Sequence, residues 1–238
     1  MSDARTPFET FRVARGRIAF GARHLARLRR TCAALAVPLD EAALAAVLAT
    51  LPATGVHRAR LEVTPDGVPH LQVAPFAPPR RRGAGVRVAW ADEVVVADAP
   101  ARRHKTRDRA IYDRGARRAT ERGLADLVYR NDRGTLAEGA VSTVFVRLGG
   151  TWWTPPVEDG ALPGVLREEL LARGRVQERS LTPADVAHAE DLAIGNALRG
   201  LRRARLHPSD PPLGASETEG ADGEQDREAG EGDGGRRA

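Results

Sequence analysis

The sequence predicts an α+β fold of two domains, and three observations support this prediction. Strand and helix patterns are mixed along the 238 residues without the regular alternation of a doubly wound sheet. No internal repeat is visible in the sequence, so a repeat architecture is not expected. A stretch rich in proline and arginine, 75–83, interrupts the pattern and predicts a linker. We therefore expect a small α/β domain at 1–78, a linker at 79–85 and a larger domain at 86–208.

The small domain is expected to begin with a strand, a turn and a helix. Apolar residues in 8–13 predict a strand, and Arg15-Gly16-Arg17 turns the chain into a short second strand at 18–20. Apolar residues then recur at helical spacing, which predicts a helix over 23–36. These residues are Leu25, Leu28, Cys32 and Leu35.

A second helix and a hairpin complete the small domain. Asp40 is placed to cap this helix, whose apolar stripe is formed by Leu44, Val47, Leu48 and Leu51. The hairpin is predicted from two strand-like runs, 59–63 and 69–73, which flank the turn Pro65-Asp66-Gly67.

The larger domain is expected to begin with two strands, at 86–89 and 94–96. A helix over 106–122 follows. Gly123 would end this helix, because glycine adopts the left-handed backbone conformation of a helix cap without strain.

Further strands are expected after this helix. One is predicted at 124–129, followed by a turn at Asn131-Asp132-Arg133-Gly134. Leu136, Val141 and 144–148 are also predicted strand residues. Gly149-Gly150 then turns the chain into a strand at 151–154.

Two helices and a strand complete the larger domain. The first helix is expected over 164–173. Thr182-Pro183-Ala184-Asp185 would open the second, with threonine as the cap and proline in the first turn. The last core strand is expected at 192–194.

Composition argues against several classes of protein. No run of about 18 apolar residues exists, so we expect no transmembrane helix. The first residues, Met1-Ser2-Asp3-Ala4-Arg5, lack the apolar core of a secretory signal. A single cysteine, Cys32, allows no disulfide framework, and the six histidines show no metal-ligand spacing. We therefore expect a soluble cytoplasmic protein without a metal site.

The last residues, 209–238, contain nine acidic and three basic side chains and almost no large apolar ones. Such a segment cannot bury enough apolar surface to offset the entropy lost on ordering, so we expect a disordered acidic tail. Because the net charge of the whole chain is +5, the remainder of the chain is strongly basic.

Only one of the 37 basic side chains is a lysine, Lys105, and all the others are arginine. A genomic drift from lysine to arginine explains this bias wherever only a charge is needed. Arginine cannot replace an amine that reacts covalently, because the guanidinium stays protonated. Lysine forms Schiff bases when its pKa is lowered. We expect repulsion from nearby arginines to lower the pKa of Lys105. These are Arg102, Arg103, Arg107, Arg109 and Arg114.

Two other charged residues have unusual surroundings in the sequence. Glu138 lies beside a glycine in an otherwise apolar strand pair, either as a solvent-facing turn residue or as a buried carboxylate with a partner. In the second case it could pair with the protonated ring nitrogen of pyridoxal phosphate (PLP). Arg27 lies on the first predicted helix with Arg23, Arg29 and Arg30, which we expect on a solvated face. Arg27 either shares that face or binds a phosphate.

Seven segments, in this order and at this spacing, resemble the class IV aminotransferase family of fold-type IV PLP enzymes. The resemblance covers residues 8–206. The segments are Phe8-Glu9-Thr10-Phe11-Arg12, His24-Leu25-Ala26-Arg27-Leu28, His104-Lys105-Thr106, Glu138-Gly139 with Val144-Phe145, Thr154-Pro155-Pro156, Leu162-Pro163-Gly164-Val165-Leu166-Arg167 and Asn196-Ala197-Leu198-Arg199-Gly200.

The resemblance implies a two-domain structure similar to D-amino acid aminotransferase, with PLP as cofactor, a small-molecule amine as substrate and a homodimer as assembly. Lys105 matches the lysine that binds PLP covalently, and Glu138 matches the carboxylate that pairs with the ring nitrogen. The positions that match phosphate-binding groups are Arg27, Val165, Leu166, Asn196 and Ala197. Thr10 and Arg109 match positions that line the active site.

Within the family, the segments around Lys105 and Asn196 resemble 4-amino-4-deoxychorismate lyases more than branched-chain or D-amino acid aminotransferases. The implied reaction gives p-aminobenzoate and pyruvate in folate synthesis, with aminodeoxychorismate synthase as the partner in the pathway. Two departures from the family pattern bear on the substrate. The N-terminal segment is short, and Thr143 stands where the family mostly has asparagine.

Two alternatives stay open. A class IV aminotransferase that acts on a branched-chain or D-amino acid would share the first half of the reaction. A nucleic-acid-binding module would account for the basic body and for Arg80-Arg81-Arg82, but aromatic residues make up only 4% of the chain and no nucleic-acid-binding motif is present. We therefore expect neither nucleic acid nor a membrane as a partner.

Overall fold

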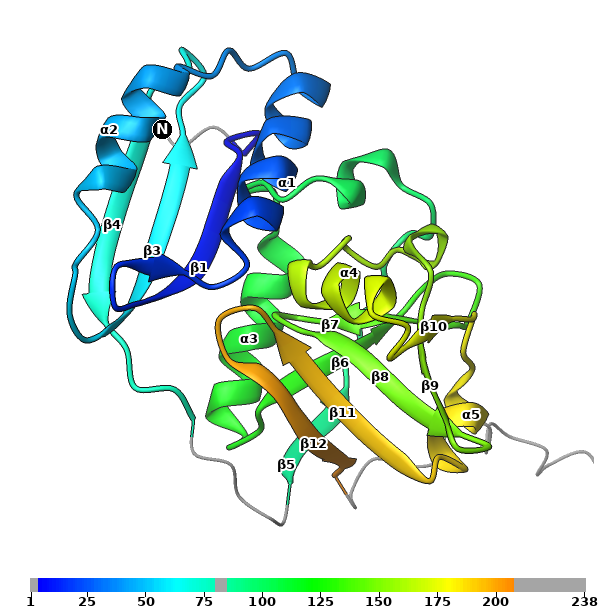
Figure 1. The fold of residues 1–238 in the computed structure, drawn as a ribbon. Coiled ribbons are helices and arrows are strands. Elements are labelled where there is room, and N and C mark those ends of the chain that lie inside the picture. The colour runs from blue at the N-terminus through cyan, green and yellow to red at the C-terminus, as the bar shows by residue number, and fades with distance from the viewer. Residues whose placement is uncertain (1–3, 80–84, 208–238) are drawn as a thin grey trace, which may run out of the picture.

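A computed structural model describes residues 4–79 and 85–207 of the chain. These residues form a four-stranded and an eight-stranded sheet, each with helices packed against it (Figure 1). This architecture confirms the predicted α+β fold. The predicted acidic tail at 209–238 and most of the predicted linker at 79–85 lie outside the described residues. The division into two domains stays a prediction.

The four-stranded sheet is antiparallel, in the order β2-β1-β3-β4. Its strands are β1 (Phe8–Ala14), β2 (Arg17–Ile18), β3 (Val56–Val63) and β4 (Pro69–Pro75). Helices α1 (Gly21–Ala34) and α2 (Glu41–Ala49) cover one face of this sheet (Figure 1). Alternate strand residues, among them Phe11 and Leu61, point towards the helices and are buried with Leu28 and Leu44.

The starts of α1 and α2 have different local causes. Phe20 adopts the left-handed conformation, with φ 57°, immediately before α1. The chain turns there, so the short strand predicted at 18–20 ends at Ile18. Asp40 caps α2 as predicted, because its Oδ1 accepts a hydrogen bond of 2.9 Å from the amide of Ala43. The predicted hairpin is confirmed as β3 and β4.

The eight-stranded sheet is mixed, in the order β10-β9-β8-β11-β12-β5-β6-β7. Its strands are β5 (Val86–Trp90), β6 (Asp126–Arg130), β7 (Leu136–Gly139), β8 (Thr143–Leu148), β9 (Thr151–Thr154), β10 (Gln177–Glu178), β11 (Asp191–Asn196) and β12 (Gly200–Leu206). The helices that pack on it are α3 (Ala110–Glu121) on β6, α4 (Val165–Ala172) on β11 and α5 (Pro183–Ala187) on β8. Two single 3-10 turns, η1 (Pro100–Arg103) and η2 (Val157–Asp159), lie in the connections.

Strand β12 corrects the prediction that 192–194 is the last core strand. It pairs antiparallel with β11 and parallel with β5, so it lies in the interior of the sheet. This strand is difficult to predict from its sequence, because Arg202, Arg203 and Arg205 interrupt the apolar pattern. No residue of β12 is fully buried.

The helix predicted over 106–122 begins only at Ala110. The backbone ahead of it forms no helix, because some of its polar groups bond to the N-terminal segment instead. The amide of Phe8 donates to the carbonyl of Lys105 at 3.0 Å, and the amide of Arg107 donates to the carbonyl of Thr6 at 3.1 Å. The end of α3 agrees with the prediction, since Gly123 follows it with a φ of 64°.

Two smaller predictions are corrected as well. Residues 94–96 form no strand, because the chain turns at Asp98, where φ is 51°, and Val95 makes only an isolated bridge to Asn131. Val141 lies in the turn between β7 and β8, where its amide donates to Asp126 rather than to a neighbouring strand. The predicted cap of α5 is confirmed by the reciprocal hydrogen bonds of Thr182 and Asp185.

The large sheet carries apolar core on both faces. One face holds a cluster that includes Val88, Val146 and Ile194, and the other packs Leu127 and Tyr129 against α3. Strands buried in this way hold the residues at their ends in fixed positions. Within the described ranges, no helix is both long and apolar enough to cross a lipid bilayer.

Candidate active site

A cavity of about 810 Å³ lies between the two sheets. All nine predicted site residues line it, namely Thr10, Arg27, Lys105, Arg109, Glu138, Val165, Leu166, Asn196 and Ala197. The first two belong to β1 and α1, whereas the others come from the segment ahead of α3, from β7, from α4 and from the end of β11. The fold thus brings together residues that are far apart in the sequence, while their chemical roles stay predictions.

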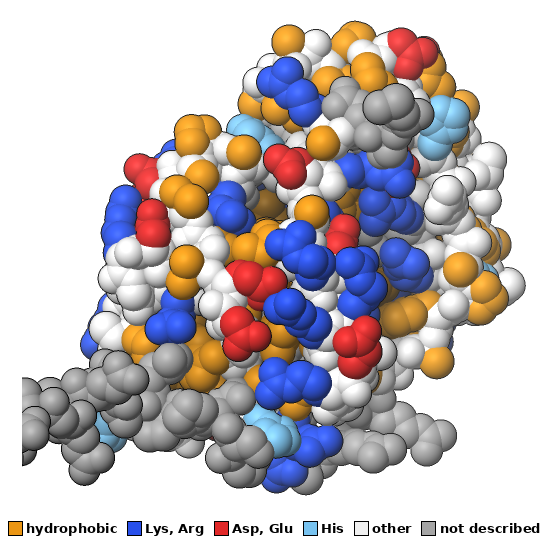
Figure 2. Space-filling view, turned by 180° about the vertical axis from the view of Figure 1, so that it is seen from behind, with side chains coloured by type: hydrophobic (Ala, Val, Ile, Leu, Met, Phe, Trp, Pro, Cys, Tyr) orange, Lys and Arg blue, Asp and Glu red, His pale blue; other side chains and the backbone are white. Residues whose placement is uncertain are grey.

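The cavity is lined by more cations than carboxylates. Its basic residues are Arg27, Arg58, Arg60, Arg102, Lys105, Arg109, Arg114 and Arg199, and its acidic ones are Asp108, Asp113 and Glu138. Basic side chains also gather near the middle of the molecule's back face (Figure 2). A cavity of this charge attracts anionic ligands. Across residues 4–79 and 85–207, no three His, Cys, Asp or Glu side chains form a group that could hold a metal ion.

Lys105 extends into the cavity from the segment ahead of α3, and its Nζ lies 4.5 Å from the centre of the Phe8 ring. Burial lowers the pKa of Lys105 from its usual 10.5 to about 7, and repulsion by Arg27 and Arg109 adds to this effect. The predicted direction is therefore confirmed, but burial is the main cause. Arg103 is instead paired with Asp98. At neutral pH, much of the Lys105 amine is unprotonated and can act as a nucleophile.

Glu138 lies on β7, with its carboxylate in the cavity. Its Oε2 accepts a hydrogen bond of 3.1 Å from the amide of Leu162. Burial raises the pKa of Glu138, whereas the Tyr112 hydroxyl, the Leu162 amide and the charge of Lys105 act in the opposite direction. The two groups that donate hydrogen bonds to this carboxylate are thus neutral. A bound cation would offset the free-energy cost of burying its negative charge.

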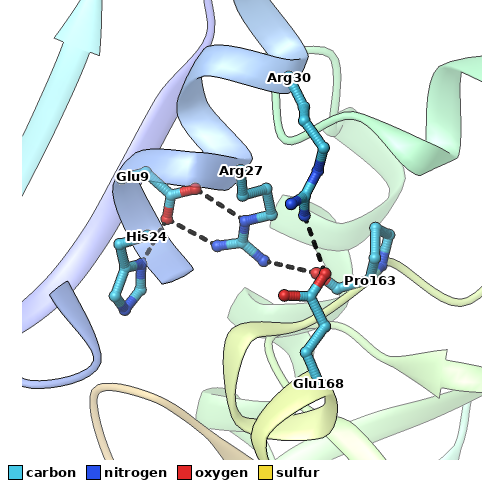
Figure 3. A network of polar contacts seen from close by, with 6 residues as sticks. All are labelled: Glu9, His24, Arg27, Arg30, Pro163 and Glu168. Atoms are coloured by element: carbon cyan, nitrogen blue, oxygen red, sulfur yellow. Dashed lines mark hydrogen bonds and ion pairs between the residues drawn. The ribbon is translucent and has the colours of Figure 1, made fainter. Parts of the chain in front are cut away.

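Glu9, His24 and Arg27 form a buried polar cluster at the cavity wall (Figure 3). Arg27 binds both carboxylate oxygens of Glu9, from Nε to Oε1 at 2.7 Å and from Nη2 to Oε2 at 2.6 Å. Nδ1 of His24 lies 2.7 Å from Oε2. Burial alone would raise the pKa of Glu9, but Arg27 and His24 hold it at about 2. Glu9 therefore stays ionised and fixes the orientation of Arg27.

Replacing Glu9 by glutamine is expected to lower the free energy of unfolding by about 3 kcal/mol, because the buried charge of Arg27 loses its partner. The pKa of Glu9 in the folded chain, about 2, lies below its usual 4.5. The stability that this carboxylate contributes is therefore present above its usual pKa and is lost as the pH falls towards the folded value. Urea unfolding of both proteins from neutral to acid pH measures this difference, which should shrink in that window.

The matched control is Glu41→Gln. Glu41 makes the same two-bond pair with Arg29, at 2.7 Å for both bonds, but on the exposed side of α1. Solvent screens this pair, so its loss is expected to change stability much less. Equal losses in the two variants would contradict a special role for the buried pair.

The N-terminus of α4 faces the cavity without a side-chain cap. The first hydrogen bond of the helix runs from the amide of Glu168 to the carbonyl of Gly164 at 2.8 Å, and this leaves the amides of Val165 and Leu166 outside the helical ladder. Packing around this turn is close, since a Cβ on Gly164 would lie 2.9 Å from Oγ1 of Thr143. Backbone amides at such a helix end bind phosphate groups well.

Arg27 links this helix end to the buried cluster. Its Nη1 donates to the carbonyl of Pro163, the residue before Gly164, at 3.0 Å. Its bonds to Glu9 and Pro163 leave N–H groups on Nη1 and Nη2 for a ligand. An anion at the N-terminus of α4 could therefore be bound by backbone amides and by a guanidinium together.

A second buried carboxylate, Asp126 on β6, holds the turn after β7 through a hydrogen bond of 3.3 Å from the amide of Val141. The carbonyls of this turn bind two predicted site residues. Ala140 accepts from Nη2 of Arg109 and Val141 accepts from Nδ2 of Asn196, both at 2.8 Å. The side chain of Asn196 therefore shapes the cavity wall through bonds within the protein.

Sequence reasoning gave no role to Glu9, His24 or Asp126. The pattern of β1 contains a signal for Glu9, which lies on the same strand face as the buried Phe11 and is itself buried. A buried carboxylate needs a partner, and this requirement points to a nearby cation. No such pattern shows which element supplies that cation.

Comparison with known proteins links these features to a family. Residues 6–206 match the family described as amino-transferase class IV. A crystal structure of a candidate amino-acid aminotransferase from Mesorhizobium loti is 31% identical, covers 85% of this chain and 99% of that chain, and has a TM-score of 0.80. The 4-amino-4-deoxychorismate lyase of Pseudomonas aeruginosa is 26% identical, with 84% and 82% of the two chains covered and a TM-score of 0.72.

A curated relative matches over a shorter stretch. An uncharacterized protein from Haemophilus influenzae is 31% identical over 81 residues, which are 34% of this chain and 42% of that protein. The chain thus aligns with less than half of the length of this relative.

Proposed function

We propose that the chain, which belongs to the class IV aminotransferase family, is a PLP-dependent 4-amino-4-deoxychorismate lyase. This reaction releases p-aminobenzoate and pyruvate. The fold is that of fold-type IV PLP enzymes, and the chain is an enzyme of this class. The observation that carries the proposal is the position of Lys105, the one lysine of the chain, whose amine lies in the cavity with a pKa of about 7.

The donor groups around the cavity fit PLP. The uncapped amides of Val165 and Leu166 and the guanidinium of Arg27 would hold the phosphate group. Glu138, whose bonded neighbours are neutral, would hold the protonated ring nitrogen. Lys105 would bind covalently to the aldehyde carbon, and Arg109 and Thr10 would line the space for the substrate.

When bound, PLP supplies an electron sink for the electron pair that a departing proton leaves on a substrate carbon. Once the substrate amine has displaced Lys105 from the cofactor, the freed Lys105 Nζ would take this proton, because its lowered pKa leaves much of the amine unprotonated, and it would later return a proton to the product. Glu138 would supply the negative charge that keeps the ring nitrogen protonated. Glu9 keeps Arg27 oriented towards the phosphate position.

The purified holoenzyme is expected to convert 4-amino-4-deoxychorismate into equal amounts of p-aminobenzoate and pyruvate. The reason is that the segments around Lys105 and Asn196 resemble those of the lyases, and the lyase of Pseudomonas aeruginosa is 26% identical to this chain. Fluorescence of p-aminobenzoate and an enzymatic assay of pyruvate measure the two products. A parallel assay with branched-chain or D-amino acids and 2-oxoglutarate serves as the control.

A class IV aminotransferase is the second candidate, because the candidate aminotransferase from Mesorhizobium loti is 31% identical and is covered over 99% of its length. Conversion of an amino acid and 2-oxoglutarate without release of p-aminobenzoate would replace the lyase proposal by this one. We further propose a homodimer in the cytoplasm that binds a small-molecule amine, with aminodeoxychorismate synthase acting in the same pathway. Salt-dependent retention on nucleic acid by a protein without PLP absorbance would instead favour a nucleic-acid-binding module.

A further inference from the structure

Three arginines on α1, Arg23, Arg27 and Arg30, form a stripe along one side of the helix. Their spacing of four and three residues places them on successive turns of the same helical face. All three reach the same short segment of the chain, 163–169, which contains the loop before α4 and its first turns. We refer to these three residues as the arginine stripe.

Each residue of the arginine stripe donates a hydrogen bond to the segment 163–169. Arg23 Nε donates to Oε2 of Glu169 at 2.6 Å. Arg27 Nη1 donates to the carbonyl of Pro163 at 3.0 Å. Arg30 Nη2 donates to Oε1 of Glu168 at 2.9 Å. Figure 3 shows the last two contacts side by side between α1 and the start of α4.

These contacts join the units built on the two sheets. Helix α1 packs on the four-stranded sheet through Leu28 and Cys32, whereas α4 packs on β11 of the eight-stranded sheet. The central member, Arg27, is almost fully buried, while Arg30 at one end is 56% exposed. The outer pairs therefore flank the buried contact at the place where the two units meet.

The proposed phosphate site is itself divided between these units. Its guanidinium is supplied by Arg27 on α1, and its backbone amides are supplied by Val165 and Leu166 on α4. Both halves bind one ligand well only if the distance between them is set before the ligand arrives, because ordering them on binding lowers the affinity.

We propose that Arg23 and Arg30 are positioning residues that hold the first turns of α4 at a fixed distance from Arg27, so that both halves can bind one phosphate group. They act through Glu169 and Glu168 and need not touch the ligand. The role in phosphate binding rests on the proposed function, whereas the restraint on α4 is a property of the protein without cofactor.

A charge exchange between Arg30 and Glu168 tests the proposal. Arg30→Glu and Glu168→Arg each place like charges opposite one another, and the double variant restores an opposite pair. Each single variant is expected to bind PLP about fivefold more weakly, and the double variant to return to within about twofold of the wild type. Absorbance titration of the apoprotein with PLP, and with pyridoxal as the probe without phosphate, measures the effect. Pyridoxal binding is expected to stay unchanged.

Glu168→Arg separates this mechanism from a general effect of charge. It adds positive charge near a phosphate site, so a long-range electrostatic effect alone would tighten PLP binding. The proposal predicts weaker binding, and tighter or unchanged binding would overturn it. The matched control is Arg29→Glu, because Arg29 is adjacent on α1 but pairs with the exposed Glu41. An effect of Arg29→Glu as large as that of Arg30→Glu would also overturn the proposal.

Hydrogen exchange of the apoprotein gives a readout that does not depend on PLP. Amides of 164–169 are expected to exchange faster in each single variant and to regain protection in the double variant. Unchanged exchange in the single variants would overturn the positioning role even if PLP binds. A wild-type chain that binds no PLP would overturn the proposed function and the phosphate part of this inference, and the exchange data would still decide whether the pair of Arg30 and Glu168 restrains α4.

Discussion

The Lys105→Arg variant is expected to lose turnover by at least about a thousandfold, although it keeps a positive charge at the same position. A guanidinium stays protonated at neutral pH, so it can neither bind PLP covalently nor take a proton from the substrate. The wild-type amine is expected to do both, because burial lowers its pKa to about 7. The variant is tested by its kcat, and by borohydride reduction followed by mass spectrometry of the peptides, which should find no pyridoxyl group.

Arg107→Lys is the matched control for this variant. Arg107 is two residues from Lys105, exposed, and 3.6 Å from Glu62, so a lysine there adds an amine outside the cavity. It is expected to keep turnover, with the pyridoxyl group still on Lys105. The double variant Lys105→Arg, Arg107→Lys is expected to remain inactive. A near-normal rate in Lys105→Arg would show that another group performs the reaction.

The lowered pKa of Lys105 also predicts how fast the apoprotein captures PLP. Only the unprotonated amine reacts, so the rate should rise about tenfold per pH unit below the pKa of about 7 and level off above it. A lysine with its usual pKa of 10.5 would show a rise that continues through alkaline pH. Stopped-flow absorbance over this pH range distinguishes the two curves.

The Glu138→Gln variant is expected to keep bound PLP but to lose turnover by about a hundredfold to a thousandfold. Glutamine preserves the size of the side chain and removes the charge that would keep the ring nitrogen protonated. The groups proposed to bind the phosphate, Arg27 and the amides of α4, are untouched by this change. Turnover and PLP content per chain are measured on the same preparation. Glu138→Ala is also expected to lose turnover while it keeps some PLP, but it should retain less PLP than Glu138→Gln.

Asp108→Asn provides a control for the loss of a carboxylate from this cavity. Asp108 lines the cavity but is exposed to solvent, and we assign it no contact with the ring nitrogen. Its loss is expected to leave turnover near the wild-type value. If Glu138→Gln were equally active, the pairing of Glu138 with the ring nitrogen would have to be abandoned.

The sequence allowed Lys105 and Glu138 to be singled out because their chemistry leaves a local trace, whereas most other cavity residues were predicted only through the resemblance to a family. A single lysine among 37 basic residues stands out, because arginine can replace its positive charge but not its reactive amine. Glu138 stands out because a charged residue interrupts an apolar strand. The resemblance to a family then gave these separate signals a common meaning, and the fold placed both residues at one cavity.

The parts that could not be predicted depend on contacts between distant segments. The late start of α3 follows from the bond between the amide of Phe8 and the carbonyl of Lys105, which no local pattern shows. Arg23 and Arg30 have the sequence pattern of solvated residues, and only the approach of α4 gives them partners. Strand β12 is obscured for a related reason, because its neighbours β11 and β5 supply the backbone bonds that its arginine-rich sequence does not suggest.

The position of β12 has a consequence for how the chain is completed during synthesis. Residues 200–206 are made last among the described strands, yet they lie between β11 and β5. Until they leave the ribosome, these two strands present unpaired edges that can capture other nascent chains. All strands of the four-stranded sheet lie within 8–75, so that sheet can form while the rest of the chain is still being made. A stalled or prematurely ended chain would therefore contain one finished sheet and one open, aggregation-prone sheet.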